Sequence, residues 1–251
     1  MLKTYTQGHS SALPPLLIVH GLFGSARNWS VIAKRLTEDR VVHTVDMRNH
    51  GESPRYSSQS YMDMANDLAH VINDLGAPMD VLGHSMGGKA AMVLAVQSPD
   101  IVNRLLVADI APVAYSHTQM PLIEAMRSLD LAQVEKRSDA DRLLQDAIPD
   151  DGVRAFLLQS LDVNDQQWRL NLDVLADQMD KILGFPALTG QFDKPALFLS
   201  GGASDYVLPA HRPLIKALFS NAYFAKMPDV GHWLHAEKPR DFEASIRAFF
   251  S

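Results

Sequence analysis

A serine between glycines gives the first indication of chemistry. It lies in residues 83–88, whose sequence is GHSMGG, directly after the apolar pair 81–82 and before a helix-forming stretch. A sharp turn from a strand into a helix needs small flanking residues, because the serine backbone is strained and neighbouring segments pack closely. Such a turn exposes the hydroxyl and directs a helix N-terminus at the reacting carbonyl. Ser85 is therefore predicted to be a nucleophile; a plain glycine-rich turn is the alternative.

A serine hydroxyl is a weak nucleophile unless a base takes its proton. Of the ten histidines, His232 is the best candidate for this base, since it follows the last expected strand and precedes a C-terminal helix. A nucleophile early in the chain and a histidine near its end is the order that α/β hydrolases use. His84 is expected to pack beneath the serine turn, and His20 and His50 to brace loops through hydrogen bonds. His235 lacks the further ligands of a metal site, so no metal is predicted.

Ester chemistry also needs two backbone N–H groups directed at the oxyanion that develops during attack. One is expected from Met86, the residue after the nucleophile. The other is expected from Leu22, in the glycine-containing loop 20–24 (HGLFG) that follows the first buried strand. The side chains of Phe23 and Trp233 are expected to line the substrate pocket.

Four motifs appear in the order found in α/β-hydrolase esterases: residues 20–25 (HGLFGS), 46–53 (DMRNHGES), 83–88 and 231–233 (GHW). The chain resembles the YbfF-type acyl esterases most, also through residues 109–112 (DIAP) and 232–239 (HWLHAEKP). The resemblance implies hydrolysis of carboxylic esters, including acyl thioesters, without a cofactor.

Two aspartates are candidates for the acid that orients the histidine. Asp205 occupies the place where most α/β hydrolases carry it. Asp109 ends the expected strand after the nucleophile helix, where the chain resembles the YbfF-type esterases, which carry their acid there. In these esterases the later loop reads GGNS, so Ser204 rather than Asp205 is the matching position. Asp109 is favoured, and Asp205 stays open.

The elements that position these residues alternate between short apolar runs and longer amphipathic stretches, which predicts a mostly parallel sheet with crossover helices. The expected strands are 16–19, 41–45, 79–82, 105–108, 196–199 and 223–227, and the expected helices 28–36, 62–75, 89–97 and 241–250. The predicted fold is an α/β-hydrolase core of residues 1–115 and 186–251. Residues 116–185 show helical periodicity instead and are predicted to form an inserted helical cap, with Leu122, Met126 and Phe156 as candidate pocket linings.

Charge and composition exclude several classes of protein. The net charge of −6 gives no support to nucleic-acid binding, and without cysteine there is no disulfide or thiolate chemistry. The whole acidic excess lies in the expected cap, with thirteen acidic and seven basic residues; near the pocket mouth it would disfavour anionic substrates. The N-terminus lacks a signal-peptide pattern and no apolar run is long enough for a membrane span. A cytoplasmic protein without membrane association is expected, and its oligomeric state stays open.

The predicted function is that of a serine carboxylesterase acting on small to medium acyl esters, or acyl thioesters, through an acyl-Ser85 intermediate. Because one fold supports many chemistries, alternatives stay open. A C–C hydrolase or a menaquinone-pathway-type lyase could use the same residues. A small-molecule receptor that retains its triad is the alternative outside enzymes.

Overall fold

The computed structural model describes residues 1–251 and is built around a seven-stranded sheet. Its spatial order is β1-β3-β2-β4-β5-β8-β9, and only β1 pairs antiparallel. The strands are β1 Thr4–Gln7, β2 Leu16–Val19, β3 Val42–Val45, β4 Met79–His84, β5 Val102–Ala108, β8 Ala196–Gly201 and β9 Ala222–Met227. The predicted mostly parallel α/β architecture is confirmed.

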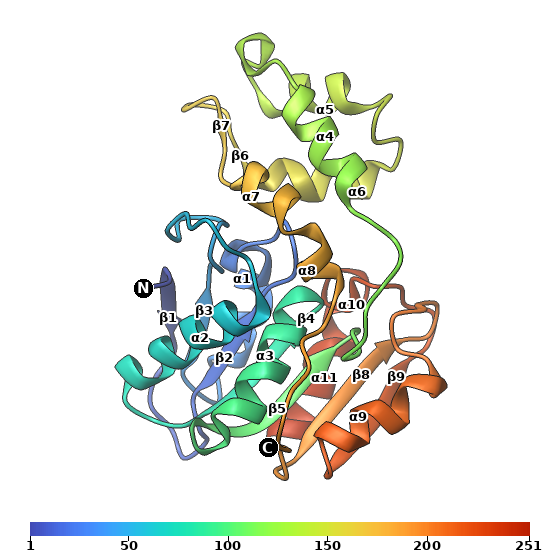
Figure 1. Cartoon of the computed structure of the whole chain (residues 1–251). Coiled ribbons are helices and arrows are strands. Elements are labelled where there is room, and N and C mark those ends of the chain that lie inside the picture. Colours follow the sequence, from blue (N-terminus) through green and yellow to red (C-terminus); the bar gives the residue numbers. More distant parts are fainter.

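Helices cover both faces of this sheet (Figure 1). They are α1 Ser30–Leu36, α2 Tyr61–Leu75, α3 Met86–Gln97, α9 Arg212–Leu218, α10 Leu234–Glu237 and α11 Pro239–Phe250. Side chains alternate across a strand, so Leu105 and Val107 of β5 join the hydrophobic cluster that contains α2 and α3. Leu106 and Ala108 join the cluster on the other face, with α1 and α11. The inner strands β2, β4 and β8 are buried along their whole length, which explains why they are mostly apolar in the sequence.

Each predicted strand and helix of the core is present, and its bounds differ from the predicted ones by a few residues at most. Helix α3 begins at Met86 rather than at residue 89, directly after the serine, because glycines 87 and 88 are part of the helix. Strand β5 begins at Val102, and the region 28–36 is a 3₁₀ turn, η1 (Ala26–Trp29), followed by α1. Strand β1 was not predicted, because its sequence TYTQ is a polar, partly exposed edge strand without an apolar run.

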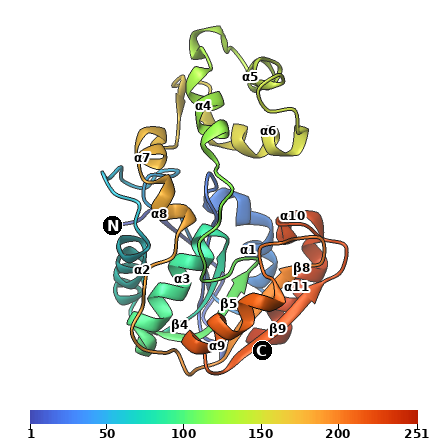
Figure 2. The ribbon, with the colours of Figure 1, turned by 45° about the vertical axis from the view of Figure 1, so that its right-hand side comes forward.

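Residues 116–185 lie between β5 and β8 in the chain and form a mostly helical segment beyond the end of the sheet (Figures 1 and 2). Its elements are α4 Met120–Ser128, α5 Arg137–Leu144, α6 Asp151–Leu157, the hairpin β6 Leu161–Asp162 and β7 Gln167–Trp168, α7 Leu172–Asp177 and α8 Met179–Leu183. The short hairpin was not predicted. No helix in the structure combines the length and the apolar character that crossing a membrane would require.

Candidate active site

Ser85 stands in the turn between β4 and α3, with a φ of 52° and a ψ of −122°. A positive φ is strained for a residue with a side chain. The flanking glycines allow this turn: a Cβ at Gly83 would collide with the carbonyl oxygen of Gly87. A Cβ at Gly87 would collide with the carbonyl oxygens of Val19 and His20. The spacing of the motif thus follows from close backbone packing around the serine.

Parallel pairing places the ends of β4, β5 and β8 beside one another. The backbone N–H of Ser85 donates to Ala108 at 3.1 Å, and that of Asp109 donates to Leu199 at 2.9 Å. Both residues therefore leave the sheet at the same edge, one strand apart. Asp109 is fully buried and also has a positive φ, 50°.

The side chains of Ser85, His232 and Asp109 form one chain of hydrogen bonds. The Nδ1 of His232 lies 2.8 Å from Oδ2 of Asp109, and its Nε2 lies 3.0 Å from Oγ of Ser85. A carboxylate can only accept, so Nδ1 carries the proton and Nε2 is free to accept the serine hydroxyl proton. This arrangement can transfer a proton from the hydroxyl to the imidazole.

The two candidate acids have different surroundings. Oδ1 of Asp109 accepts the Gly201 N–H at 2.9 Å, and Oδ2 accepts the Ser204 hydroxyl as well as the imidazole. Asp205 is exposed and makes no hydrogen bond to His232. The structure therefore brings Asp109, not Asp205, to the histidine, and the loop after β8 contributes Ser204 as a neutral donor.

His232 is carried on the loop between β9 and α10. The imidazole stacks on the ring of Tyr206, with centroids 3.9 Å apart and planes inclined by 19°. The carbonyl oxygen of His232 accepts a hydrogen bond from Nε2 of buried His84 at 2.9 Å. His84 thus packs beneath the site and steadies the histidine loop from below. Nothing in the sequence pattern had indicated a role for Tyr206 in the site.

Two N–H groups near Ser85 have no acceptor within the protein. Met86 is the first residue of α3, where a helix leaves its N–H groups free. The N–H of Leu22 makes no intramolecular hydrogen bond, whereas that of Phe23 donates to Nε2 of His50 at 3.2 Å. Both Leu22 and Met86 border the cavity that contains Ser85, which is the arrangement that oxyanion binding requires.

Two buried histidines hold the loop that carries Leu22. The Nδ1–H of His20 donates to the Gly21 carbonyl at 2.7 Å, and Nε2 of the same ring accepts a hydrogen bond from the Met47 N–H at 2.9 Å. His50 is held in the same way: its Nδ1–H donates to the Arg48 carbonyl at 2.8 Å, and its Nε2 accepts from the Phe23 N–H. Burial lowers the pKa of His20 to about 4 and that of His50 to about 3. Both rings are therefore neutral near pH 7 and accept a backbone N–H through Nε2.

A cavity of about 310 Å³ opens above Ser85 and is lined mostly by hydrophobic side chains. Phe23 and Trp233 both line it, and so do Leu122 and Phe156 from the helical segment. Met126 does not line it, because this residue is buried within the helical segment, where its carbonyl accepts the indole N–H of Trp168. Phe156 lies over Trp233, with ring centroids 5.7 Å apart.

The cavity also has polar lining residues that sequence reasoning missed. No acidic side chain lines it, so the acidic excess of residues 116–185 faces elsewhere and the expected bias against anionic substrates loses its basis. The charged residue that does line it is Lys89, which is almost fully buried. His235 also borders the cavity; it stacks on Trp29 at 4.3 Å, and its Nδ1 has no hydrogen-bond partner. In the sequence, Lys89 is only one basic residue of a helical stretch, with no signal of its burial.

The profile of the alpha/beta hydrolase family matches residues 16–245, and the chain therefore belongs to this family. Among curated proteins, it is 42% identical over 253 residues to the sn-1-specific diacylglycerol lipase ABHD11 of Mus musculus, covering 96% of this chain and 82% of that protein. It is 38% identical over 240 residues to the esterase YbfF of Escherichia coli K12, covering 94% and 93% of the two chains.

A solved structure described as a marine microorganism esterase superposes with a TM-score of 0.93 at 36% identity. The match covers 99% of this chain and 98% of that one. The predicted class, a carboxylic ester hydrolase of the α/β-hydrolase fold, is thereby confirmed, together with the resemblance to YbfF.

Proposed function

We propose that this α/β hydrolase is a serine carboxylesterase that cleaves small to medium, uncharged acyl esters through an acyl-Ser85 intermediate. The observation that carries the proposal is the hydrogen-bond chain from Ser85 through His232 to Asp109, at the floor of an apolar cavity. The cavity volume of about 310 Å³ is near the lower end for ligand pockets, which favours modest acyl groups.

In the proposed mechanism, Oγ of Ser85 attacks the ester carbonyl while Nε2 of His232 takes its proton. The carbonyl oxygen becomes an oxyanion held by the N–H groups of Leu22 and Met86. Asp109 accepts from Nδ1–H and stabilises the imidazolium. The imidazolium then protonates the leaving alcohol as the C–O bond breaks, and acyl-Ser85 remains. Water, deprotonated by the same imidazole, attacks this acyl group and releases the acid.

We also propose that two parts of the chain have different roles in the reaction. Residues 1–115 and 186–251 supply the core with the catalytic groups, and residues 116–185 act as a cap that supplies substrate contacts. The lining residues Leu122 and Phe156 support this role for the cap. Thioesters fit the same mechanism, because only the leaving group differs.

The decisive experiment compares Ser85→Ala with the wild type on p-nitrophenyl and thioester acyl chains. Loss of the nucleophile of a catalytic triad lowers kcat by about 10⁶, so turnover should fall to background and fluorophosphonate labelling should disappear. Ser98→Ala, at the other end of α3, is the matched control and should keep full activity. Labelling that persists in Ser85→Ala would identify another nucleophile.

The same panel separates the alternative functions. A small-molecule receptor that retains its triad would be labelled, or would turn over only very slowly. A C–C hydrolase or a lyase would hydrolyse the esters of the panel only very slowly, although fluorophosphonate would label Ser85. Rapid multiple turnover on esters would be inconsistent with both.

A further inference from the structure

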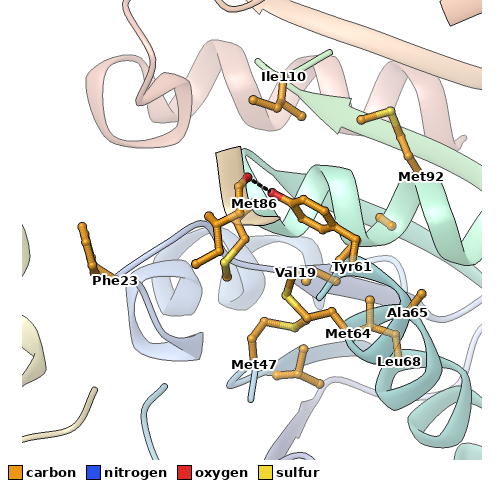
Figure 3. Packing of buried hydrophobic residues seen from close by; sticks show 14 of the residues in the cluster. Val19, Phe23, Met47, Tyr61, Met64, Ala65, Leu68, Met86, Met92 and Ile110 are labelled. Atoms are coloured by element: carbon orange, nitrogen blue, oxygen red, sulfur yellow. Dashed lines mark hydrogen bonds between the residues drawn. The ribbon is translucent and has the colours of Figure 1, made fainter. Parts of the chain in front are cut away.

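Three consecutive carbonyl groups at the end of α8 are held by donors from the core. The Tyr61 hydroxyl, from which the dashed line in Figure 3 runs, donates to the carbonyl of Ile182 at 2.5 Å. The backbone N–H of Tyr115 donates to Leu183 at 3.0 Å. Nζ of Lys89 donates to Leu183 at 2.8 Å and to Gly184 at 2.6 Å. The last helix of the cap is thus fixed to α2 and α3 at every carbonyl from 182 to 184.

Ile182 and Leu183 of this segment line the cavity, whereas Gly184 lies behind them and does not. Tyr61, Lys89 and Ile182 all line the cavity and are nearly inaccessible to solvent. By contrast, the lining residues His117 and Trp233 are exposed or partly exposed, so the opening lies on their side. An acyl chain that enters from the opening and passes Ser85 on this side would meet the part of the wall that Ile182 and Leu183 form.

Lys89 is an unusual residue for such a position. Its ammonium has no carboxylate partner; besides the two carbonyls it faces the rings of Tyr115 and Tyr61, 4.7 and 5.5 Å away. Burial lowers its pKa to about 7. An apolar side chain would fill this space without the cost of burying a charge. What the ammonium adds is a pair of charge-assisted hydrogen bonds, about twice as strong as neutral ones, that hold the cap segment in place.

We propose that Lys89 and Tyr61 set the longest acyl chain that the enzyme accepts, because they fix Ile182 and Leu183 as the end wall of the acyl pocket. This inference rests on the proposed esterase function. Both are positioning residues in this role. Neither side chain makes a hydrogen bond to Ser85, His232 or Asp109; the backbone N–H of Lys89 donates to the Ser85 carbonyl at 3.0 Å, and a substitution keeps that bond. Removing the side-chain donors should therefore affect long acyl groups far more than short ones.

The test compares kcat/KM on p-nitrophenyl decanoate and acetate for Lys89→Met, which keeps the stem and removes the donors, and for Tyr61→Phe, which removes one hydroxyl. Each methylene that newly enters an apolar site adds about fourfold to kcat/KM. The decanoate-to-acetate ratio of kcat/KM should therefore rise at least about tenfold in Lys89→Met and by less in Tyr61→Phe. Lys194→Met is the matched control, since Lys194 also donates to two carbonyls, of Pro99 and Val102, but does not line the cavity.

A pH profile adds a readout that a merely structural lysine would not change. The groups that face Lys89 are the hydroxyls of Tyr61 and Tyr115, whose pKa values burial raises, so they stay uncharged near neutrality. Titration of the catalytic groups affects both esters alike and cancels in the ratio. The wild-type ratio should rise between pH 6 and 8.5 as the ammonium loses its proton, whereas the ratio of Lys89→Met should be flat.

Failure of the end-wall role and failure of the proposed esterase function would give different results. Ratios within twofold of wild type in both variants would overturn the end-wall role, and Tyr61→Phe decides alone if Lys89→Met does not fold. Absence of ester turnover in the wild type, or activity that survives in Ser85→Ala, would instead overturn the proposed esterase.

Discussion

Replacing Asp109 by asparagine tests the assignment of the acid most directly, because the carboxylate accepts hydrogen bonds at both oxygens. Oδ1 accepts the Gly201 N–H, and Oδ2 accepts from Ser204 and His232. An amide can present an oxygen on one side only, and its NH₂ group must face a donor on the other. Each of the two orientations therefore has a definite cost.

If the amide NH₂ faces Gly201, the Gly201 N–H loses its acceptor and the NH₂ finds none, so two buried donors are unpaired, at about 1–3 kcal/mol each. The imidazole then keeps its tautomer but loses the negative charge that stabilises its protonated form. If the NH₂ faces His232, the imidazole must accept at Nδ1 and carry its proton on Nε2, where it can no longer receive the proton of Ser85. Such an inverted tautomer costs about 10⁴ in kcat, or about 5.5 kcal/mol.

We therefore expect Asp109→Asn to lower kcat on p-nitrophenyl acetate by about 10³–10⁴, with KM changed little because the acid does not touch substrate. Asp205→Asn is the control and should stay within about twofold of wild type, since that side chain is exposed. Thermal unfolding of both variants checks that lost activity is not lost folding. More than a tenth of the wild-type kcat in Asp109→Asn, together with a collapse in Asp205→Asn, would refute the assignment.

Two further predictions concern stability. His20 has a pKa of about 4 when folded and 6.5 as the ordinary value, so the folded state binds fewer protons between these limits and stability falls as pH drops through 6.5 towards 4. Between pH 7 and 5, the free energy of urea unfolding should fall by about 2 kcal/mol more in the wild type than in His20→Gln. An equal fall in both proteins would contradict this. Asp80 is fully buried and pairs with Arg40 at 2.7 Å and Arg104 at 2.8 Å. Asp80→Ala should cost about 3–5 kcal/mol in urea unfolding, against less than about 1 kcal/mol for Asp173→Ala in an exposed pair; equal losses would count against the buried network.

The sequence predicted most of the sheet because its inner strands, such as β2, β4 and β8, are buried and consist mostly of apolar residues. Leu16–Val19 was predicted to the residue, and Ala196–Gly201 was missed only at its polar and glycine end. Thr4–Gln7 was missed because an edge strand pairs through its backbone and needs no apolar side chains. Periodicity therefore identifies the elements that build the core and overlooks those held by hydrogen bonds alone.

Ser85 and His232 could be proposed from the sequence because their surroundings are local: a glycine pattern around one and a chain position for the other. Lys89 and Tyr61 could not be linked to the pocket in this way. Their partners, the carbonyls of residues 182–184, lie about a hundred residues further along the chain, and backbone carbonyls leave no trace in the side-chain sequence. Only the packing of α8 against α2 and α3 reveals the contact.

The acid was ambiguous for a related reason, and the structure suggests why one carboxylate is better than two. Strands β5 and β8 are neighbours, so loops after either can reach the imidazole. With Asp109 on β5, the loop after β8 contributes only neutral donors to it, the Gly201 N–H and the Ser204 hydroxyl. A carboxylate in place of Ser204 would put two like charges side by side in a buried site, which raises the free energy of the ionised pair. The exposed position of Asp205 avoids that repulsion and leaves one oriented acceptor for His232.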